Sequence, residues 1–309
     1  HLDQGEIQQL RAQSPDRLEL SIPAPEGGLL QLELVRANIF SPEFTVRESS
    51  NRDVPVDVEP GLHYWGIVKD HPETLAGVSI FETEVMGMVY QGAEKIVFAK
   101  LEQDLSGTHI LYRESDLRHK PGFECWSDML EDVSNGPAAA QNRSAGPDNC
   151  VRMYMEADYT IYQNKGSLAN ATAYIEGFFS QVALLYANES INIVLNELLV
   201  WTTTDPYTGP SSSNYLTQFR NALNGVYNGD LAHLVGFTGG GGIAYLDVLC
   251  NSFYGVGYSG INTTYSNVPT YSWTVEVVTH EIGHNLGSPH THACAWNGNN
   301  TAIDGCGPT

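Results

Sequence analysis

The stretch "HEIGHNLGSPHTH", residues 280–292, decides how this sequence is interpreted, because it holds four histidines and one glutamate within thirteen positions. We expect a helix that begins near Trp273 to continue into it. On a helix, His280 and His284 lie one turn apart and project from the same face. Both imidazoles can therefore reach one metal ion.

The rest of the stretch supplies a base and a third ligand. Glu281 follows His280 directly, so it can hydrogen-bond a water on the ion without ligating the ion. Gly287 permits the positive φ that ends a helix, and His290 can then return toward the two helical histidines. Three neutral nitrogen ligands leave one tetrahedral position for water, which is the pattern of a catalytic zinc site.

This ligand set predicts hydrolysis of a peptide bond. Zinc lowers the pKa of a bound water and polarises a carbonyl, while Glu281 accepts the proton and later passes it to the leaving amine. The alternative is a group of surface histidines near a helix end. The spacing H-E-x-x-H-x-x-G-x-x-H favours the metal site. No ligand position remains for His292, which we expect to be an ordinary loop histidine.

The composition limits the possible classes of protein. The chain has 309 residues, 42% of them hydrophobic, so it can bury a large core in one or two domains. No apolar run approaches the roughly 18 residues of a membrane span. With 36 acidic and 15 basic residues the net charge is −21. This balance argues against nucleic acid or anionic lipid as a partner, and a solvated acidic surface is favoured over a specific cationic substrate.

The two halves of the chain show different patterns. Residues 1–133 contain short alternating runs that predict a β-rich domain, an antiparallel sandwich or barrel, with a hairpin formed by 18–22 and 29–34. Its further strands are expected at 63–68, 75–81, 85–90 and 95–101. Residues 134–149, "SNGPAAAQNRSAGPDN", have the composition of a linker.

Residues 150–309 alternate strands with helices, which predicts an α/β domain with a mostly parallel sheet. Strands are expected at 151–162, 191–201, 231–237 and 241–250, and helices at 168–188 and 213–225, before the helix that carries the histidines.

From residue 151 onward the chain resembles the reprolysin/adamalysin family of metzincin metalloproteases, most strongly after Gly239. The resemblance is carried by "HEIGHNLGSPH" and "GGIAYLDVLC". It implies a twisted sheet whose antiparallel edge strand pairs with an extended peptide substrate, next to an active-site helix. The residues so implied in substrate binding are Gly242, Ile243, Ala244 and Tyr245. An ordinary core strand over 243–249 is the alternative.

The sequence departs from the family pattern in places. Thr291 follows the third histidine where the family has aspartate, and every methionine precedes the histidine helix. We therefore expect the catalytic domain to be C-terminally incomplete, its upper part being present. The family also implies calcium: Asp230 falls where a ligand is expected, but Glu156 is offset, and a surface acidic residue is the other interpretation of Asp230.

The resemblance further implies a secreted zymogen with a β-rich propeptide, and residues 61–81 look like part of one. A thiolate can take the place of the zinc-bound water. We expect Cys125, just upstream of the linker, to be this inhibitory thiol, and a buried or disulfide-bonded cysteine is the alternative. Arg143 in the linker is the expected activating cut. Cys294 and Cys306 are expected to close a short disulfide loop.

The favoured function is that of a secreted zinc endopeptidase, which acts on proteins or peptides and is inhibited by its own propeptide. A catalytically inactive binding or adhesion protein on a metzincin scaffold is the second hypothesis. Retention of Glu281 argues against it, because a scaffold without activity has no need of a base. Another metzincin branch, matrixin-like or serralysin-like, is the third; the "GIAYLDVLC" strand favours reprolysin.

Overall fold

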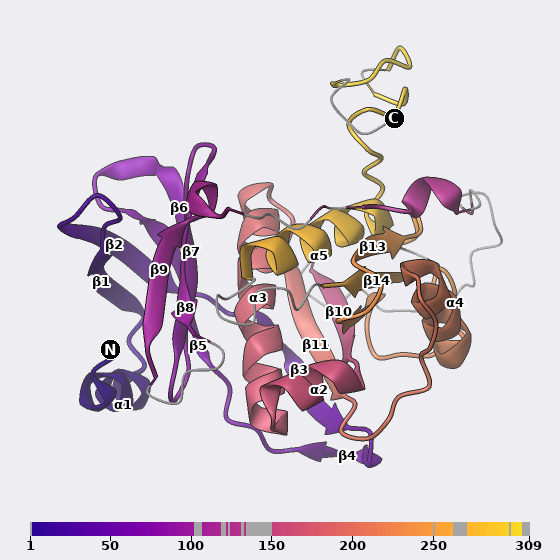
Figure 1. Ribbon diagram of the computed structural model, residues 1–309. Coiled ribbons are helices and arrows are strands. Elements are labelled where there is room, and N and C mark those ends of the chain that lie inside the picture. The colour runs from indigo at the N-terminus through magenta and orange to yellow at the C-terminus, as the bar shows by residue number, and fades with distance from the viewer. Residues whose placement is uncertain are drawn as a thin grey trace.

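The protein is described here from a computed structural model. The structure describes residues 2–101, 107–118, 122, 124–130, 133, 150–249, 251–261, 271–296 and 298–304. The predicted linker with Arg143, and the cysteines Cys250 and Cys306, lie outside these residues. Within the described residues the chain forms two seven-stranded sheets, and helix α3 (Leu168–Asn188) stands between them (Figure 1). The fold is therefore mixed α/β, as predicted.

The first sheet is antiparallel and comes wholly from the N-terminal part of the chain. Its strands, in spatial order, are β1 (Arg17–Pro23), β2 (Leu29–Arg36), β5 (Leu62–Val68), β6 (His71–Ile80), β7 (Val85–Gln91), β8 (Glu94–Lys100) and β9 (His109–Arg113). The predicted hairpin is confirmed, since Leu20 of β1 lies opposite Leu32 of β2. The expectation of a sandwich or barrel is wrong: within the described residues this sheet is open, with β1 and β9 at its edges.

The first sheet is covered by helices and not by a second sheet, as a sandwich would require. Side chains alternate between the two faces of a strand. In β8, Val97 and Ala99 join a core shared with α3, whereas Ile96 and Phe98 join a separate core on the other face. Helix α1 (Gln4–Gln13) contributes Ile7 to that second core. A sheet buried on both faces needs nearly continuous apolar strands, as in "KIVFA".

The second sheet combines both parts of the chain. Its strands, in spatial order, are β13 (Gly241–Ala244), β14 (Val256–Gly260), β12 (Leu231–Gly236), β10 (Val151–Ala157), β11 (Ile193–Val200), β3 (Phe40–Glu48) and β4 (Asn51–Val56). Strands β14, β12, β10, β11 and β3 pair in parallel, and β13 and β4 run antiparallel to their neighbours at the two edges. Two strands that precede the predicted linker thus extend the sheet that follows it.

Two predicted strands are shorter than expected. The strand predicted at 151–162 ends at Ala157, because the Asp158 side chain accepts a hydrogen bond from Ile161 N and begins helix α2 (Tyr159–Lys165). The strand predicted at 241–250 ends at Ala244, and Asp247 adopts a φ of +56° in the turn that follows. In both places a short polar residue supports a local turn.

Helix α5 (Tyr271–Asn285), which carries the histidines, packs beside α3. The hydroxyl of Tyr186 donates to Thr279 O at 2.7 Å, and the hydroxyls of Tyr174 and Thr274 lie 3.1 Å apart. These buried contacts fix α5 against a helix that is itself packed on both sheets. In the part of the chain that the structure describes, each helix is too short or too polar to span a bilayer.

Candidate active site

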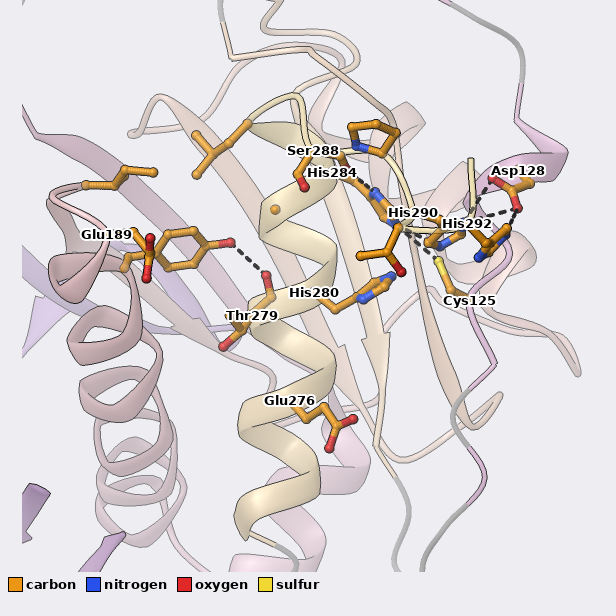
Figure 2. Close-up of a pocket in the computed structure, with 16 residues that line it drawn as sticks. Cys125, Asp128, Glu189, Glu276, Thr279, His280, His284, Ser288, His290 and His292 are labelled. Atoms are coloured by element: carbon orange, nitrogen blue, oxygen red, sulfur yellow. Dashed lines mark hydrogen bonds and ion pairs between the residues drawn. The ribbon is translucent and has the colours of Figure 1, made fainter. Parts of the chain in front are cut away.

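The last turns of α5 bring His280 and His284 together, with ring centroids 4.6 Å apart. Gly287 then adopts a φ of +99°, as the sequence predicts, and the chain turns back. His290 returns to the helix, so that its Nε2 lies 3.2 Å from Nε2 of His284 (Figure 2). The three predicted ligands therefore meet in one place.

Hydrogen bonds on the outer nitrogens orient two of these rings. Nδ1 of His284 lies 2.7 Å from Ser288 O, and Nδ1 of His290 lies 3.1 Å from both carboxylate oxygens of Asp128. These oxygens are acceptors, so Nδ1 of each ring carries the proton and donates it to them. The other nitrogen, Nε2, then directs its lone pair into the site. Burial, and then the neighbouring imidazoles, lower the pKa of His280 to about 3. The His280 ring is thus held in the neutral form that binds metal.

These side chains fit a zinc ion. Two nitrogens bound tetrahedrally at ~2.0–2.1 Å from zinc lie about 3.3 Å apart, and the observed separation of His284 and His290 is 3.2 Å. Cys125 Sγ joins the group, and the four donor atoms all lie within 4.8 Å of one another. Three imidazoles and one thiolate are ligands that zinc prefers.

Glu281 lies beside this group and is fully buried. Its Oε2 accepts a hydrogen bond from Ser127 Oγ at 3.3 Å, while Oε1 has no hydrogen-bond partner among the described residues. Burial raises the pKa of Glu281, and hydrogen bonds from Cys125 and Ser127 oppose this rise. A buried carboxylate oxygen left open is costly, and such an atom is what a general base presents to a water.

The edge strand β13 passes directly over Glu281. A Cβ at Gly242 would lie 2.3 Å from Oε1 of Glu281, so only glycine allows this approach. Ile243 and Ala244 follow on the strand, whereas Tyr245 lies just beyond it. The Tyr245 ring packs 4.9 Å from that of Tyr254, which makes Tyr245 part of the core below the strand.

The outer side of β13 pairs with residues 124–130, named here the Cys125 segment. Gly242 N donates to Glu124 O at 3.0 Å, and Trp126 N donates to Gly242 O at 3.1 Å, in a parallel bridge. Ala244 N donates to Ser127 Oγ at 3.0 Å. The Cys125 segment thus occupies the strand edge that the family resemblance assigns to a peptide.

Cys125 itself reaches the three histidines. Its Sγ lies 3.3 Å from Nε2 of His284, and the thiol forms no disulfide. Burial and the nearby Glu281 carboxylate raise the pKa of the Cys125 thiol. That direction holds for the protein alone, since a coordinated metal ion deprotonates a thiol outright.

Two residues of this site, Ser127 and Asp128, were not predicted. The only signal for them is a polar pair two and three positions after the cysteine. Asp128 contacts His290 and also lies 3.7 Å from Nε2 of His292. Thr291, which stands where the family has aspartate, is exposed and donates to Asp304. In this structure the acidic partner of the third histidine therefore comes from the Cys125 segment.

A pocket of about 800 Å3 opens along α5 in front of the histidines (Figure 2). Tyr186 and Leu286 line it together with the histidines, and Glu189 and Glu276 lie on its wall. Its lining includes Glu276, which lies on α5 four positions before His280 (Figure 2).

Asp230, which was weighed as a calcium ligand, and the offset Glu156 both have partners within the protein. The Asp230 carboxylate accepts hydrogen bonds from the backbone and guanidinium of Arg152, the closest at 2.9 Å. Glu156, buried in the core, accepts from Tyr154, Trp201 and Tyr207. These contacts favour a structural role for both carboxylates.

The predicted disulfide stays a prediction. Cys294 is exposed, and its expected partner Cys306 lies outside the described residues.

Comparison with known proteins identifies similar sequences. Residues 148–309 match the model of metallo-peptidase family M12. The chain is 29% identical over 154 residues to the snake venom metalloproteinase trimerelysin-2 of Protobothrops flavoviridis, covering 47% of this chain and 74% of that protein. It is 26% identical over 313 residues to disintegrin and metalloproteinase domain-containing protein 19 of Mus musculus. That match covers 92% of this chain but only 33% of the mouse protein.

A solved structure is similar over both parts of the chain. Metalloproteinase-II from Bacteroides fragilis superposes with a TM-score of 0.50 at 14% sequence identity, covering 94% of this chain and 87% of that one. At this identity the likeness concerns the fold alone.

Proposed function

The chain belongs to metallopeptidase family M12, as a reprolysin-like metzincin, and on this premise we propose that it is the latent form of a secreted zinc endopeptidase. The observation that carries the proposal is the convergence of His284 and His290, whose Nε2 atoms lie 3.2 Å apart, beside the buried Glu281. His280, His284 and His290 would hold the zinc ion. Similarity to a venom metalloproteinase supports secretion.

The chain's own residues divide the work of peptide hydrolysis. Zinc, when bound, supplies a Lewis acid that acidifies water and polarises the peptide carbonyl. The main chain of Gly242 offers one donor and one acceptor to an extended peptide, which aligns the scissile bond. Oε1 of Glu281 accepts the proton of the attacking water and delivers it to the leaving amine. Burial raises the pKa of Glu281, which makes this carboxylate a stronger base than an exposed one.

The Cys125 segment accounts for latency in this proposal. Cys125, whose Sγ lies 3.3 Å from His284 Nε2, would hold the ligand position that the three histidines leave open. Ser127 hydrogen-bonds Glu281, and the main chain on either side of Cys125 pairs with Gly242. A peptide needs all three of these positions. The segment therefore excludes a substrate from metal, base and strand at once.

An inactive binding protein on the same scaffold is the competing proposal. Such a protein would have no use for a buried carboxylate with an open oxygen, because burial of Glu281 costs free energy. The unpartnered Oε1 therefore favours catalysis.

The test is cleavage of a quenched fluorescent peptide by the whole secreted protein carrying Cys125→Ala. We expect this variant to cleave the peptide, chelation to stop cleavage, and zinc to restore it. Cys150→Ala is the matched control, because Cys150 is another cysteine of the described residues and does not belong to the group of donor atoms around the histidines. It should stay as inactive as the parent.

A double variant, Cys125→Ala with Glu281→Gln, isolates the base. We expect loss of at least about 100-fold in kcat with zinc content unchanged. Equal rates with and without Glu281 would reject the mechanism. A zinc-loaded Cys125→Ala protein that cleaves nothing would favour the inactive scaffold.

A further inference from the structure

We propose that the N-terminal part of the chain stays bound to the protease part after the linker is cut, because it donates strands β3 and β4 to the protease sheet. The N-terminal part means residues 2–130, and the protease part means residues 150–304. The docking surface is the edge of β11 together with one face of α3. Its consequence for activity rests on the proposed function, whereas the binding itself does not.

The first element of this surface is the parallel pairing of β3 with β11, whose register shifts once, between Leu195 and Glu197. Val46 lies opposite Leu198, and the neighbouring residues of both strands stay in register. The pairing continues past the strand ends, where Leu195 N donates to Ile39 O at 2.8 Å and Ser49 N donates to Val200 O at 3.0 Å. Strand addition of this kind supplies affinity through the main chain.

A buried polar contact lies where the register of β3 and β11 shifts. Ser41 Oγ donates to Asn196 Oδ1 at 2.6 Å, and Asn196 is fully buried. The amide nitrogen of Asn196 is used within the protease part, where it donates to Asn228 O at 2.9 Å. Ser41 therefore completes the hydrogen bonds of an interior side chain of the protease part.

Charged side chains extend the contact at its rim. Arg47 of β3 forms an ion pair with Glu197 of β11 at 3.3 Å. The guanidinium of Arg52 lies 4.2 Å above the ring of Trp201. Cation–π and ion-pair contacts of this kind add specificity more than affinity.

The second element is the face of α3 that meets the antiparallel sheet. Glu176 on α3 is 1% exposed, and it accepts a hydrogen bond from Gly61 N at 2.9 Å. His63 Nε2 lies 3.6 Å from the same carboxylate, and Ser79 holds the other ring nitrogen at 2.8 Å. Gly61, His63 and Ser79 all belong to the N-terminal part. A buried carboxylate of the protease part is thus matched by groups that only the N-terminal part supplies.

Apolar contacts join these polar ones. The core around α3 includes Phe81 and Met88 from the N-terminal part and Phe178 and Val182 from α3, all in one cluster of buried residues. A Cβ at Gly177 of α3 would lie 2.1 Å from the sulfur of Met86, which shows how closely the helix approaches the sheet. The interface is therefore packed as a protein interior is.

A cut within residues 134–149 breaks none of these contacts, because each joins residues before the linker to residues after it. The Cys125 segment also precedes the linker, so it stays tethered to the bound N-terminal part. Tethering keeps the local concentration of the segment high. We therefore expect cutting alone to leave the protease latent, and release to require loss of the β3–β11 pairing.

The test uses the whole protein with a site-specific protease sequence placed in the linker. After cutting, native mass spectrometry and gel filtration at micromolar concentration should show a one-to-one complex of the two pieces. Peptide cleavage should remain at the level of the uncut protein. Pieces that separate at once, or full activity in an intact complex, would overturn the proposal.

Val46→Asp tests whether strand donation holds the complex. It places a carboxylate at a position of β3 that is 4% exposed and faces Leu198 across the strands. We expect the dissociation constant of the cut pieces to rise roughly 100-fold. Val54→Asp is the matched control, because Val54 lies on the outer strand β4 and is 55% exposed. Equal effects of the two substitutions would overturn the role of β3.

Two further measurements keep the outcomes separate. If Val46→Asp does not fold, Arg47→Glu replaces it as the test. This substitution places a carboxylate opposite that of Glu197 at the same edge and leaves the core unchanged. The complex is detected by mass, so it can be found even if Cys125→Ala shows no activity. That combination would reject the proposed function and leave the strand donation standing.

Discussion

Substitution of Gly242 by alanine tests whether the edge strand and the base must lie in contact. The new Cβ would lie 2.3 Å from Oε1, 2.4 Å from Cγ and 2.5 Å from Cδ of Glu281. Ordinary contacts of a Cβ begin at 3.4 Å, so the strand or the carboxylate must move by 3.4 − 2.3 = 1.1 Å. Either movement would separate the proposed proton acceptor from the peptide that we propose β13 aligns.

A misplacement of about 1 Å in an active site costs on the order of 100-fold in rate. We expect this loss in kcat for Gly242→Ala, measured with a fluorescent peptide in the Cys125→Ala background. Overpacking of a buried site should also lower the free energy of unfolding by about 1–3 kcal/mol, measured by urea denaturation. Zinc content should be unchanged, because Gly242 holds no ligand.

Gly240→Ala is the control for strain in the turn that leads into β13. Gly240 has a φ of +47° and no atom within 4 Å of its Cβ position, so alanine there strains the backbone but does not displace Glu281. If the kcat values of Gly242→Ala and Gly240→Ala agree within about twofold, catalysis does not require the close contact between Gly242 and Glu281.

Three further outcomes are expected. In metal-free protein, burial depresses the pKa of His280 to about 3, so only the unfolded state takes up its proton as pH falls from 6.5 toward 3. The free energy of unfolding therefore falls over that pH range. Between pH 7 and pH 5, urea titrations of His280→Gln should show a fall that is about 1–2 kcal/mol smaller than that of the parent. Asn285→Ala removes buried hydrogen bonds to Tyr245 O and Val256 O, and should cost about 2–3 kcal/mol of unfolding free energy without loss of zinc. Chelation should lower the Tm of the parent, and zinc should restore it, but His290→Ala should show neither change in calorimetry.

The local pattern of the histidine helix was enough to predict how its residues meet. Spacing on a helix and one glycine define the approach of His280, His284 and His290, and these are short-range effects. The hairpin of β1 and β2 was predicted for the same reason, since alternation and a turn act within a few residues. Such features need no knowledge of the rest of the chain.

The residues that the sequence did not reveal depend on long-range packing. Strand β3 contains Pro42 and follows no clean alternation, and its place beside β11 is set by partners about 150 positions away. Strand β14, "VGYSG", is rich in glycine and forms only between two neighbours. Ser127 and Asp128 acquire their contacts from the approach of Cys125 to α5. Single-sequence patterns carry no signal for such pairings.

The Cys125 segment lies where a substrate is expected, which raises the question of why it would survive beside a hydrolytic site. At the position nearest the histidines the segment presents a sulfur atom, not a peptide carbonyl, since Cys125 Sγ lies 3.3 Å from His284 Nε2. A thiolate is no substrate for hydrolysis. Ser127 Oγ lies 3.3 Å from Oε2 of Glu281, so a side chain of the segment hydrogen-bonds the carboxylate beside its open oxygen Oε1. The segment therefore binds the strand as a peptide does, yet offers neither the carbonyl nor the water that cleavage requires.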